Sequence, residues 1–153
     1  MTIAPSNPSP MIAAIRVFHD IVFGPAAPEL PALVRALDAL AMAYHGTPEG
    51  TASEQDLDPP ERDYKETYAK IGPRFPILGY YGVADPLEID GKFMLGDAID
   101  DLADISNDLA ETLWRWEHLG PDDAHWHFHQ MFFHWGWHMR ELQSYLNAYL
   151  FRR

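Results

Sequence analysis

The chain has no cysteine, and this absence excludes several kinds of chemistry. Without thiols it has no disulfide, no thiolate nucleophile and no cysteine ligand for zinc or an iron–sulfur cluster. Positive charge is also scarce, because 11 Lys and Arg stand against 23 Asp and Glu, for a formal net charge of −12. A field of that sign repels nucleic acids and anionic lipid surfaces. We therefore expect partners that are neither nucleic acid nor membrane.

Long apolar runs are missing as well. The most hydrophobic stretch, 131–139, is interrupted by His134 and His138, so the sequence offers no run of about 18 apolar residues for a membrane span. Residues 1–10 are rich in Pro and Ser and contain no Lys or Arg, which predicts a disordered tail rather than a secretory signal. Together with the lack of cysteine, these features favour a bacterial-type cytoplasmic protein.

The 153 residues, 47% of them hydrophobic, fit one domain with one core, which we place at 11–153. Apolar residues recur at helical spacing in four long segments, at 11–22, 30–44, 97–118 and 121–151, and in a short one at 64–71. Short connections join the first pair and the last pair of long segments. The predicted fold class is all-α: an antiparallel four-helix-bundle-like domain with one short extra helix.

Two segments interrupt this helical pattern. Residues 46–63 hold several Pro and Gly and six acids against the single base Arg62, and predict an acidic, mobile loop. Residues 72–96 are broken by Pro and Gly yet strongly apolar, so we expect a long loop that covers the core, with its conformation left open. Within it, Asp90-Gly91 predicts a hairpin that pairs 87–89 with 92–94.

A row of acids marks the helix predicted at 97–118. The row steps by four and three residues and so forms one lengthwise stripe: Asp97, Asp101, Asp104, Asp108 and Glu111. Like charges at this spacing repel one another, so the stripe costs stability unless partners neutralise it. We expect those partners on the following helix, which carries five of the eight histidines between 125 and 138.

The reversal at Gly120-Pro121 fixes which residues of the two helices meet. In an antiparallel pair turning there, residues whose numbers add to about 240 are level, because both helices rise about 1.5 Å per residue. His138 is then level with Asp101, and His134 lies next to Asp104 and Asp108. We therefore predict that imidazoles and carboxylates meet between the two helices.

This histidine–aspartate seam allows three interpretations. In the first, His–Asp pairs are structural and fix the register of the helices. In the second, His134, His138, Asp101 and Asp104 bind a divalent metal such as Zn, Fe or Mn. In the third, an Asp–His pair carries out acid–base catalysis on a small molecule. The Glu-x-x-His pattern of di-iron bundles and the zinc-protease pattern H-E-x-x-H are both absent from the sequence.

All five tryptophans fall between 114 and 137, around the predicted turn. We expect most of them to plug that end of the core. Trp126 and Trp137 lie off the main apolar stripe and are candidates for an interaction surface, because tryptophan is enriched where proteins bind one another. His125, His127 and His129 alternate, so a helix scatters them around its axis and they make no compact ligand set.

Several short motifs occur in a characteristic order: Tyr80-Tyr81, Asp85-Pro86-Leu87-Glu88, Gly96-Asp97, Asp101-Leu102-Ala103-Asp104-Ile105, Asp108-Leu109, and His134-Trp135-Gly136 followed by His138. In this order the chain, over roughly 64–150, resembles an uncharacterised bacterial family described only as a domain of unknown function. The resemblance implies an all-helical cytoplasmic protein. It implies no activity and no catalytic residue.

Two functions follow as hypotheses. The first is a non-enzymatic interaction or accessory protein, acidic and cytoplasmic, that binds a protein partner near the tryptophans or the acidic loop. The alternative is a divalent-metal-binding helical-bundle protein, which includes a metal-dependent hydrolase or oxidase. The sequence leaves the oligomeric state open, with a homodimer as one option.

Overall fold

The computed structural model describes residues 9–152, so most of the predicted tail at 1–10 lies outside the described residues. The elements are α1 (Pro10–Phe23), α2 (Leu30–Gly46), α3 (Tyr64–Ile71), the 3-10 turn η1 (Gly72–Arg74), β1 (Tyr80–Val83), β2 (Met94–Asp97), α4 (Ala98–His118), α5 (Pro121–Gln130), the π-helical turn η2 (Phe132–Gly136) and α6 (Trp137–Phe151). The helical class is confirmed, with a small two-stranded sheet added. Within 9–152, no helix is long and apolar enough to cross a membrane.

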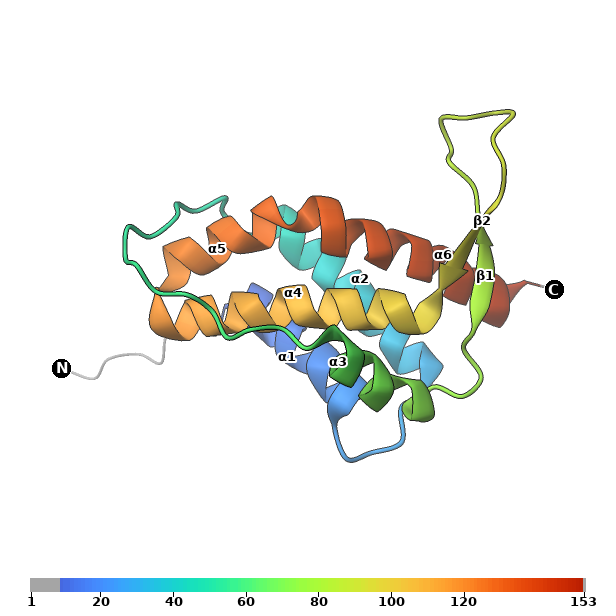
Figure 1. Ribbon diagram of the computed structural model, residues 1–153, viewed down its shortest axis with the longest axis horizontal. Coiled ribbons are helices and arrows are strands. Elements are labelled where there is room, and N and C mark those ends of the chain that lie inside the picture. Colours follow the sequence, from blue (N-terminus) through green and yellow to red (C-terminus); the bar gives the residue numbers. More distant parts are fainter. Residues whose placement is uncertain (1–8, 153) are drawn as a thin grey trace.

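Helix α4 lies at the centre of the molecule (Figure 1). It contacts α1, α3, α5, η2 and α6, while α2 contacts α1 and α6. Apolar side chains from all the long helices meet in one core, which includes Phe18, Leu37, Leu102, Phe128 and Leu142. At the end of α4 the chain reverses through Gly120, whose φ of +95° lies in the region that glycine adopts at least cost. This reversal lays α5 and α6 back along α4.

Side-chain caps begin three of the helices where the sequence offers them. The Ser9 hydroxyl accepts from the Ile12 N–H, so Ser9 and Pro10 belong to α1 rather than to a tail. The Asp63 carboxylate accepts from the Glu66 N–H at 3.0 Å and begins α3. Asp97 caps α4 in the same way, accepting from the Ile99 N–H at 2.9 Å. The first acid of the stripe therefore has a structural task.

The last helix is not continuous, so the prediction of one helix over 121–151 is wrong. Five residues, 132–136, form the π turn η2 between α5 and α6. Gly136 makes this turn compact, because a Cβ there would meet the Phe132 ring at 2.5 Å. The Phe132 ring in turn stacks on Tyr44 of α2, with ring centroids 3.5 Å apart and planes within 10°. Packing against α2 thus holds a turn that a periodic apolar pattern does not reveal.

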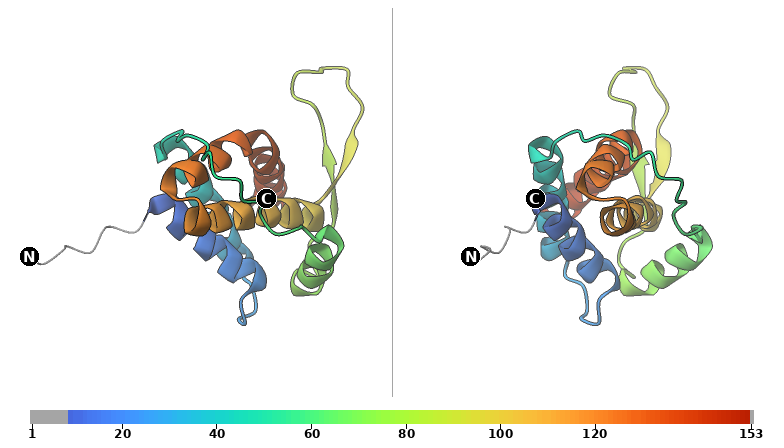
Figure 2. Two further views of the ribbon diagram at one scale, coloured as in Figure 1. Left: turned by 60° about the vertical axis from the view of Figure 1, so that its left-hand side comes forward. Right: turned by 90° about the vertical axis from the view of Figure 1, so that its left-hand side faces the viewer.

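The segment 72–96 also differs from the prediction. Phe75 and Leu78 are buried in the core, but the chain then leaves the body as a hairpin, here called the arm (residues 80–97). Strands β1 and β2 pair antiparallel from Tyr80 with Asp97 to Val83 with Met94, so the predicted register of 87–89 with 92–94 is wrong. The arm projects away from the helices (Figures 1 and 2). Tyr81, at its base, packs against the core, but the outer part of the arm does not cover it.

The acidic segment after α2 carries no regular secondary structure over 47–63, but it is tied to the helices at several points. The Thr51 N–H donates to the carbonyl of Asp122, and the Ser53 N–H donates to the Asp123 carboxylate at 2.8 Å. At its other end, the Arg62 guanidinium reaches two acids of α4. The segment therefore connects α2 to α3 across α5 and α4 (Figure 2).

Candidate metal centre

Every acid of the stripe on α4 has a partner, either a hydrogen-bond donor or a basic side chain. Its partners are Tyr68 at Asp97, Tyr81 and His138 at Asp101, His138 at Asp104, Arg62 and His134 at Asp108, and Arg62, Arg115 and His127 at Glu111. We predicted partners only on the helix after α4. The tyrosines come instead from α3 and β1, and Arg62 comes from the acidic segment. The repulsion expected along the stripe is thus offset by elements distant in the sequence.

His138, in the first turn of α6, contacts two of these acids. Its Nδ1 lies 2.7 Å from Oδ1 of Asp101, and its Nε2 lies 3.2 Å from Oδ2 of Asp104. The Asp101 carboxylate is buried and also accepts a hydrogen bond from the Tyr81 hydroxyl. His138 is therefore held by one buried carboxylate and faces a second, half-buried one.

His134, in η2, is held in the same manner one turn earlier. Its Nδ1 lies 2.6 Å from Oδ2 of Asp108, whose side chain is completely buried. The other oxygen of Asp108 accepts from Arg62 at 2.6 Å, so this carboxylate is fully engaged. The rings of His134 and His138 lie with their centroids 4.9 Å apart at 82°. Each imidazole thus has its Nδ1 fixed by a buried acid of α4.

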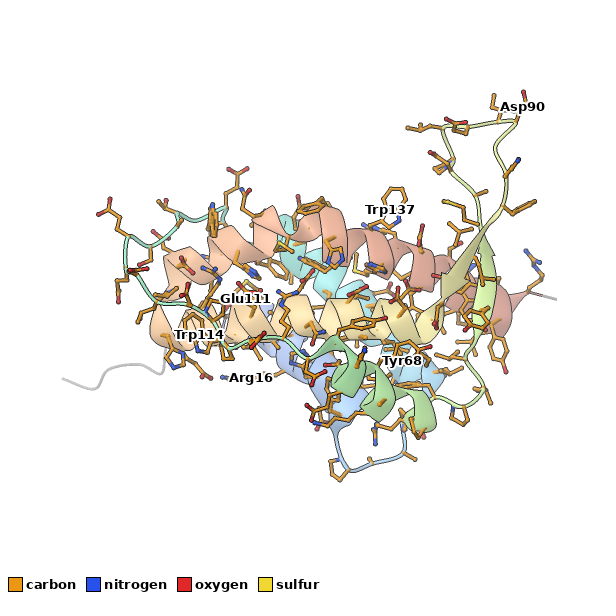
Figure 3. All side chains as sticks on the ribbon, viewed as in Figure 1. Arg16, Tyr68, Asp90, Glu111, Trp114 and Trp137 are labelled. Atoms are coloured by element: carbon orange, nitrogen blue, oxygen red, sulfur yellow. The ribbon has the colours of Figure 1, made fainter. Side chains whose placement is uncertain are left out.

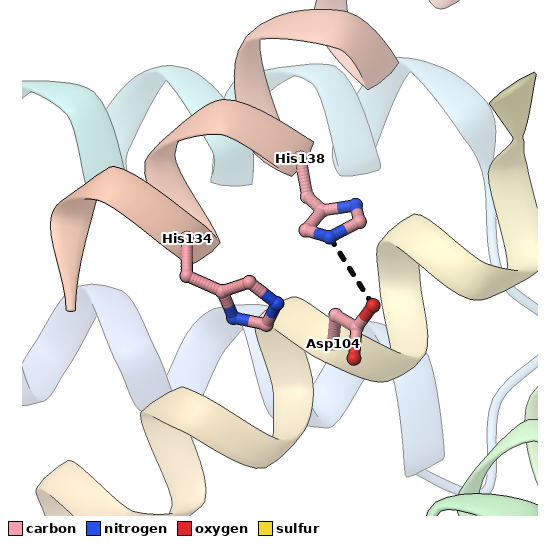
Figure 4. A group of neighbouring side chains, drawn as sticks. All are labelled: Asp104, His134 and His138. Atoms are coloured by element: carbon pink, nitrogen blue, oxygen red, sulfur yellow. Dashed lines mark ion pairs between the residues drawn. The ribbon is translucent and has the colours of Figure 1, made fainter.

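Three side chains converge on one point of the seam: Asp104, His134 and His138 (Figure 4). One potential ligand atom from each lies within 4.8 Å of the other two. Because both Nδ1 atoms are engaged with Asp101 and Asp108, the Nε2 atoms are the ones that can act as ligands, and a metal would take the place of the contact between Nε2 of His138 and Asp104. Two imidazoles and a carboxylate are a donor set suited to Zn, Fe or Mn, with coordination positions left over for water or a substrate.

A second group of potential ligands adjoins the first and shares His138. It consists of Asp100, Asp101 and His138. Here Asp101 already accepts from Tyr81 and His138, and Asp100 accepts from the Tyr64 hydroxyl. Since these oxygens have partners in the protein, we take the Asp104 group as the candidate centre.

Burial and charge shift the pKa values of the groups around His138 in opposing ways. Burial lowers the pKa of His138, but the Asp101 hydrogen bond and the charges of Asp101, Asp104 and Asp100 outweigh it, so the pKa lies above 6.5. Burial raises the pKa of Asp101, although His138 and Tyr81 act against this. Burial also raises the pKa of the Asp104 carboxyl. Protons therefore bind this seam readily and compete with any metal.

A glycine lets Tyr81 reach the seam from the arm. Tyr81 of β1 faces Gly96 of β2, and a Cβ on Gly96 would meet the tyrosine ring at 2.6 Å. The ring therefore lies flat over the glycine and points its hydroxyl at Asp101. Burial and this hydrogen bond raise the pKa of Tyr81 far above its ordinary value, so it stays a donor.

The structure brings together all four residues predicted for the seam: His134, His138, Asp101 and Asp104. Asp101 lies behind His138 as a hydrogen-bond acceptor, while Asp104 lies at the point of convergence. Asp108 and Tyr81 were absent from the predicted site. From the levels of the two helices we expected Asp108 next to His134, and the structure places it there, although it was not among the four candidate ligands. For Tyr81 no spacing in the sequence gives a signal.

The tryptophans plug the turn only in part, because Trp116 is half-buried and packs against the core there, while the prediction for most of them is wrong. Of the five, only Trp135 is completely buried, and it lies in η2 rather than at the α4–α5 turn. Trp126 is half-buried, and its ring lies beneath the Arg115 guanidinium, 5.6 Å from centroid to Cζ. Trp137 is 54% exposed and stands on the outer side of α6, on the side toward which the arm projects (Figure 3). The two candidate surface tryptophans therefore do not form one patch.

The three alternating histidines separate as expected, and His127 completes a second polar network. Its Nε2 lies 3.2 Å from Glu111, and its Nδ1 lies 2.9 Å from the Thr112 hydroxyl. Glu111 also accepts from Arg62 at 2.7 Å and from Arg115 at 3.0 Å. The hydrogen bond from His127, opposed by burial and aided by the two arginines, holds the pKa of Glu111 well below 4.5.

We expect Glu111→Gln to destabilise the protein by about 1–2 kcal/mol at neutral pH, because it removes three contacts with donors that carry or share charge. A carboxyl group whose pKa is lowered in the folded protein stabilises it fully above pH 4.5, and this stabilisation is lost as the pH falls toward the folded-state pKa. The difference in the free energy of unfolding between wild type and variant should therefore become smaller below pH 4.5. Urea unfolding across this range measures it. Glu117→Gln, at an exposed position of α4, is the control; a constant gap would contradict the prediction.

No protein-family model and no curated protein sequence matches this chain, so the family resemblance stays an expectation. A solved structure does match: the crystal structure of protein BF1032 from Bacteroides fragilis has a TM-score of 0.71. The alignment covers 94% of this chain and 91% of that chain at 15% sequence identity. At this identity the likeness concerns the fold alone. The chain thus shares its overall fold with a protein from Bacteroides fragilis.

Proposed function

We propose that the protein binds a divalent transition metal through Asp104, His134 and His138. The observation that carries the proposal is which nitrogen of each imidazole is hydrogen-bonded to a buried carboxylate. Each donates its Nδ1–H to a buried carboxylate, Asp101 or Asp108, which leaves Nε2 of each ring to face Asp104. Histidine ligands in metalloproteins are oriented by this kind of carboxylate contact, which also makes the ligand nitrogen more basic.

Access to the candidate centre also favours a ligand role over a purely structural one. The side chains of His134, His138 and Asp104 are 34%, 18% and 23% exposed, so an ion can reach them. The supporting carboxylates of Asp101 and Asp108 are almost fully buried. A purely structural ion pair does not require that the carboxylates holding the imidazoles be buried while the potential ligand atoms stay accessible to solvent.

The chemistry expected of such a centre follows from its donors. A bound ion held by two imidazoles and one carboxylate would act as a Lewis acid or activate water, as in metal-dependent hydrolases and oxidases. A four-helix-bundle frame is part of the proposal, because α1 contacts α2, α2 contacts α6, α6 contacts α4 and α4 contacts α1 around the core. So is a cytoplasmic location, since the chain uses no cysteine.

Elemental analysis of protein purified without a histidine tag tests the proposal. After incubation with Zn, Fe(II) or Mn and removal of free ions, we expect ~1 ion per wild-type chain for at least one metal. His134→Ala and Asp104→Asn should each lose that ion. His129→Ala is the matched control, because His129 contacts the Thr47 carbonyl away from the seam. If wild type retains none of the three metals, the proposal fails.

A second candidate function, binding a protein partner, is favoured by one observation. The arm exposes large apolar side chains that soluble proteins normally cover, with Leu87 at 91% and Ile89 at 98%. This role does not depend on the metal. It would place the contact on the arm rather than at Trp126 or the acidic segment.

A further inference from the structure

A groove runs between the base of the arm and α6. It has a volume of about 620 Å³ and is lined largely by aromatic and apolar side chains, among them Tyr81, Val83, Pro86, Trp137, Tyr145 and Ala148. The Tyr81 and Tyr145 rings stack at 4.5 Å between centroids, with planes within 5°, and both line the groove. Such a groove is of a size and composition that takes up apolar side chains.

The outer half of the arm presents the opposite shape, a protruding apolar ridge. Leu87, Ile89 and Phe93 are 91%, 98% and 83% exposed, and Leu95 below them is 73% exposed. This density of exposed apolar side chains on one short hairpin marks a surface that another surface covers. Asp90, at the end of the arm, is the point farthest from the helices (Figure 3).

Charges on the ridge and the groove are complementary. Asp85, Glu88 and Asp90 against Lys92 make the ridge acidic. The groove carries Arg140 and Arg152 against the single acid Glu141. In a chain with a net charge of −12, a groove with more bases than acids is unusual, and it attracts an acidic ridge.

The ridge cannot fill the groove of its own chain. Tyr81, Val83 and Pro86, at the base of the arm, form one wall of that groove, and the paired strands carry residues 87–93 away from it. A second copy has no such restriction. Since ridge and groove lie at the same end of the molecule, two chains related by a two-fold axis could satisfy both reciprocally.

We propose that the protein forms a homodimer in which each arm inserts its apolar ridge into the groove between the arm and α6 of the other copy. The contact combines burial of Leu87, Ile89 and Phe93 against Trp137 and Tyr145 with pairing of the acidic tip to Arg140 and Arg152. The occupant of the groove is thus the same segment that the structure leaves uncovered.

Sedimentation and light scattering of the untagged chain over a concentration series test the proposal. Wild type should be a dimer, and Ile89→Asp and Phe93→Asp should each raise the dissociation constant at least about tenfold. Both sites are exposed, so circular dichroism should show an unchanged fold. Leu57→Asp, which adds the same charge at a 49% exposed leucine of the acidic segment, is the matched control and should stay dimeric.

A charge reversal tests the pairing itself. Arg140→Glu should weaken the dimer, and adding Glu88→Lys and Asp90→Lys to that variant should restore it. A wild type that is monomeric at all concentrations, or that grows into open-ended assemblies, overturns the proposal. So does a dimer that survives Ile89→Asp but dissociates in Met42→Asp, because Met42 lies in a different apolar groove between α1 and α2.

The lack of cysteine permits a direct distance test. Chains with Ile89→Cys are mixed with chains carrying Ala148→Cys, and the mixture is oxidised mildly. Ala148 lies in the groove, so the proposal predicts that the mixed pair forms a disulfide-linked dimer much faster than Ile89→Cys mixed with Met42→Cys. Equal rates for the two mixtures would contradict the proposed seat of the ridge.

Discussion

Replacing Trp135 with alanine is expected to lower the free energy of unfolding by ~3–5 kcal/mol. The indole is completely buried and stacks on Phe128 with ring centroids 4.7 Å apart. It also meets Tyr44 and Phe132 edge-on, and its Nε1–H donates to the Phe128 carbonyl at 2.9 Å. Alanine leaves a large cavity and removes a hydrogen bond that spans the π turn.

Chemical unfolding followed by circular dichroism measures this loss. The matched control is Phe133→Ala, because Phe133 lies in the same π turn but is 75% exposed, and its loss should cost under about 1 kcal/mol. Because Trp135 lies next to His134, the alanine variant should also bind metal more weakly under conditions where it stays folded. Equal destabilisation by the two variants would show that η2 does not depend on its buried aromatic.

Zinc, or whichever metal the chain retains, is expected to stabilise the protein more strongly as the pH rises. A metal present at about 100 times its dissociation constant adds ~2.7 kcal/mol to the free energy of unfolding. The ion needs His138 neutral, and the neighbouring carboxylates raise the pKa of His138 above 6.5, so protons compete with the ion as the pH falls through that raised pKa. The carboxylates that raise this pKa are Asp101, Asp104 and Asp100.

The metal-free protein should show the opposite trend. A histidine whose folded-state pKa is raised contributes stability that is complete below 6.5 and is lost as the pH rises through the raised value. Thermal unfolding with and without metal, from about pH 5.5 to 8.5, measures both trends. His138→Gln should remove them together. A metal effect that does not change with pH would contradict the assignment of His138 as a ligand.

The meeting of His134 and His138 with the stripe of α4 was predictable because it depends on local rules. A helix repeats its side chains every three or four residues, and a tight turn at Gly120 fixes the level of its antiparallel partner. His138 accordingly meets Asp101, as the levels predict. These steps need no knowledge of distant contacts.

The rest depends on contacts that the sequence does not encode locally. Arg62 neutralises Asp108 and Glu111 from 46 and 49 residues away, and Tyr81 enters only because the arm begins beside α4. The apolar residues of 84–95 led us to predict burial, because a sequence shows that a segment is hydrophobic but not whether anything covers that segment. The π turn, which holds one inserted residue, was missed because the apolar residues of the sequence run through it at helical spacing, among them Phe128, Met131, Trp135 and Leu142.

That inserted residue has a consequence for how the chain tolerates change in length. Every residue of an α-helix is rotated by about 100° from the one before it, so a further residue inserted into 132–136, beyond the one that the π turn already holds, would turn the whole of α6 about its axis. Leu142 and Leu146, now buried, would swing toward solvent, and His138 would leave Asp101. A one-residue insertion there would thus be more harmful than loss of several residues from the arm. The π turn therefore determines which face of α6 points toward the core.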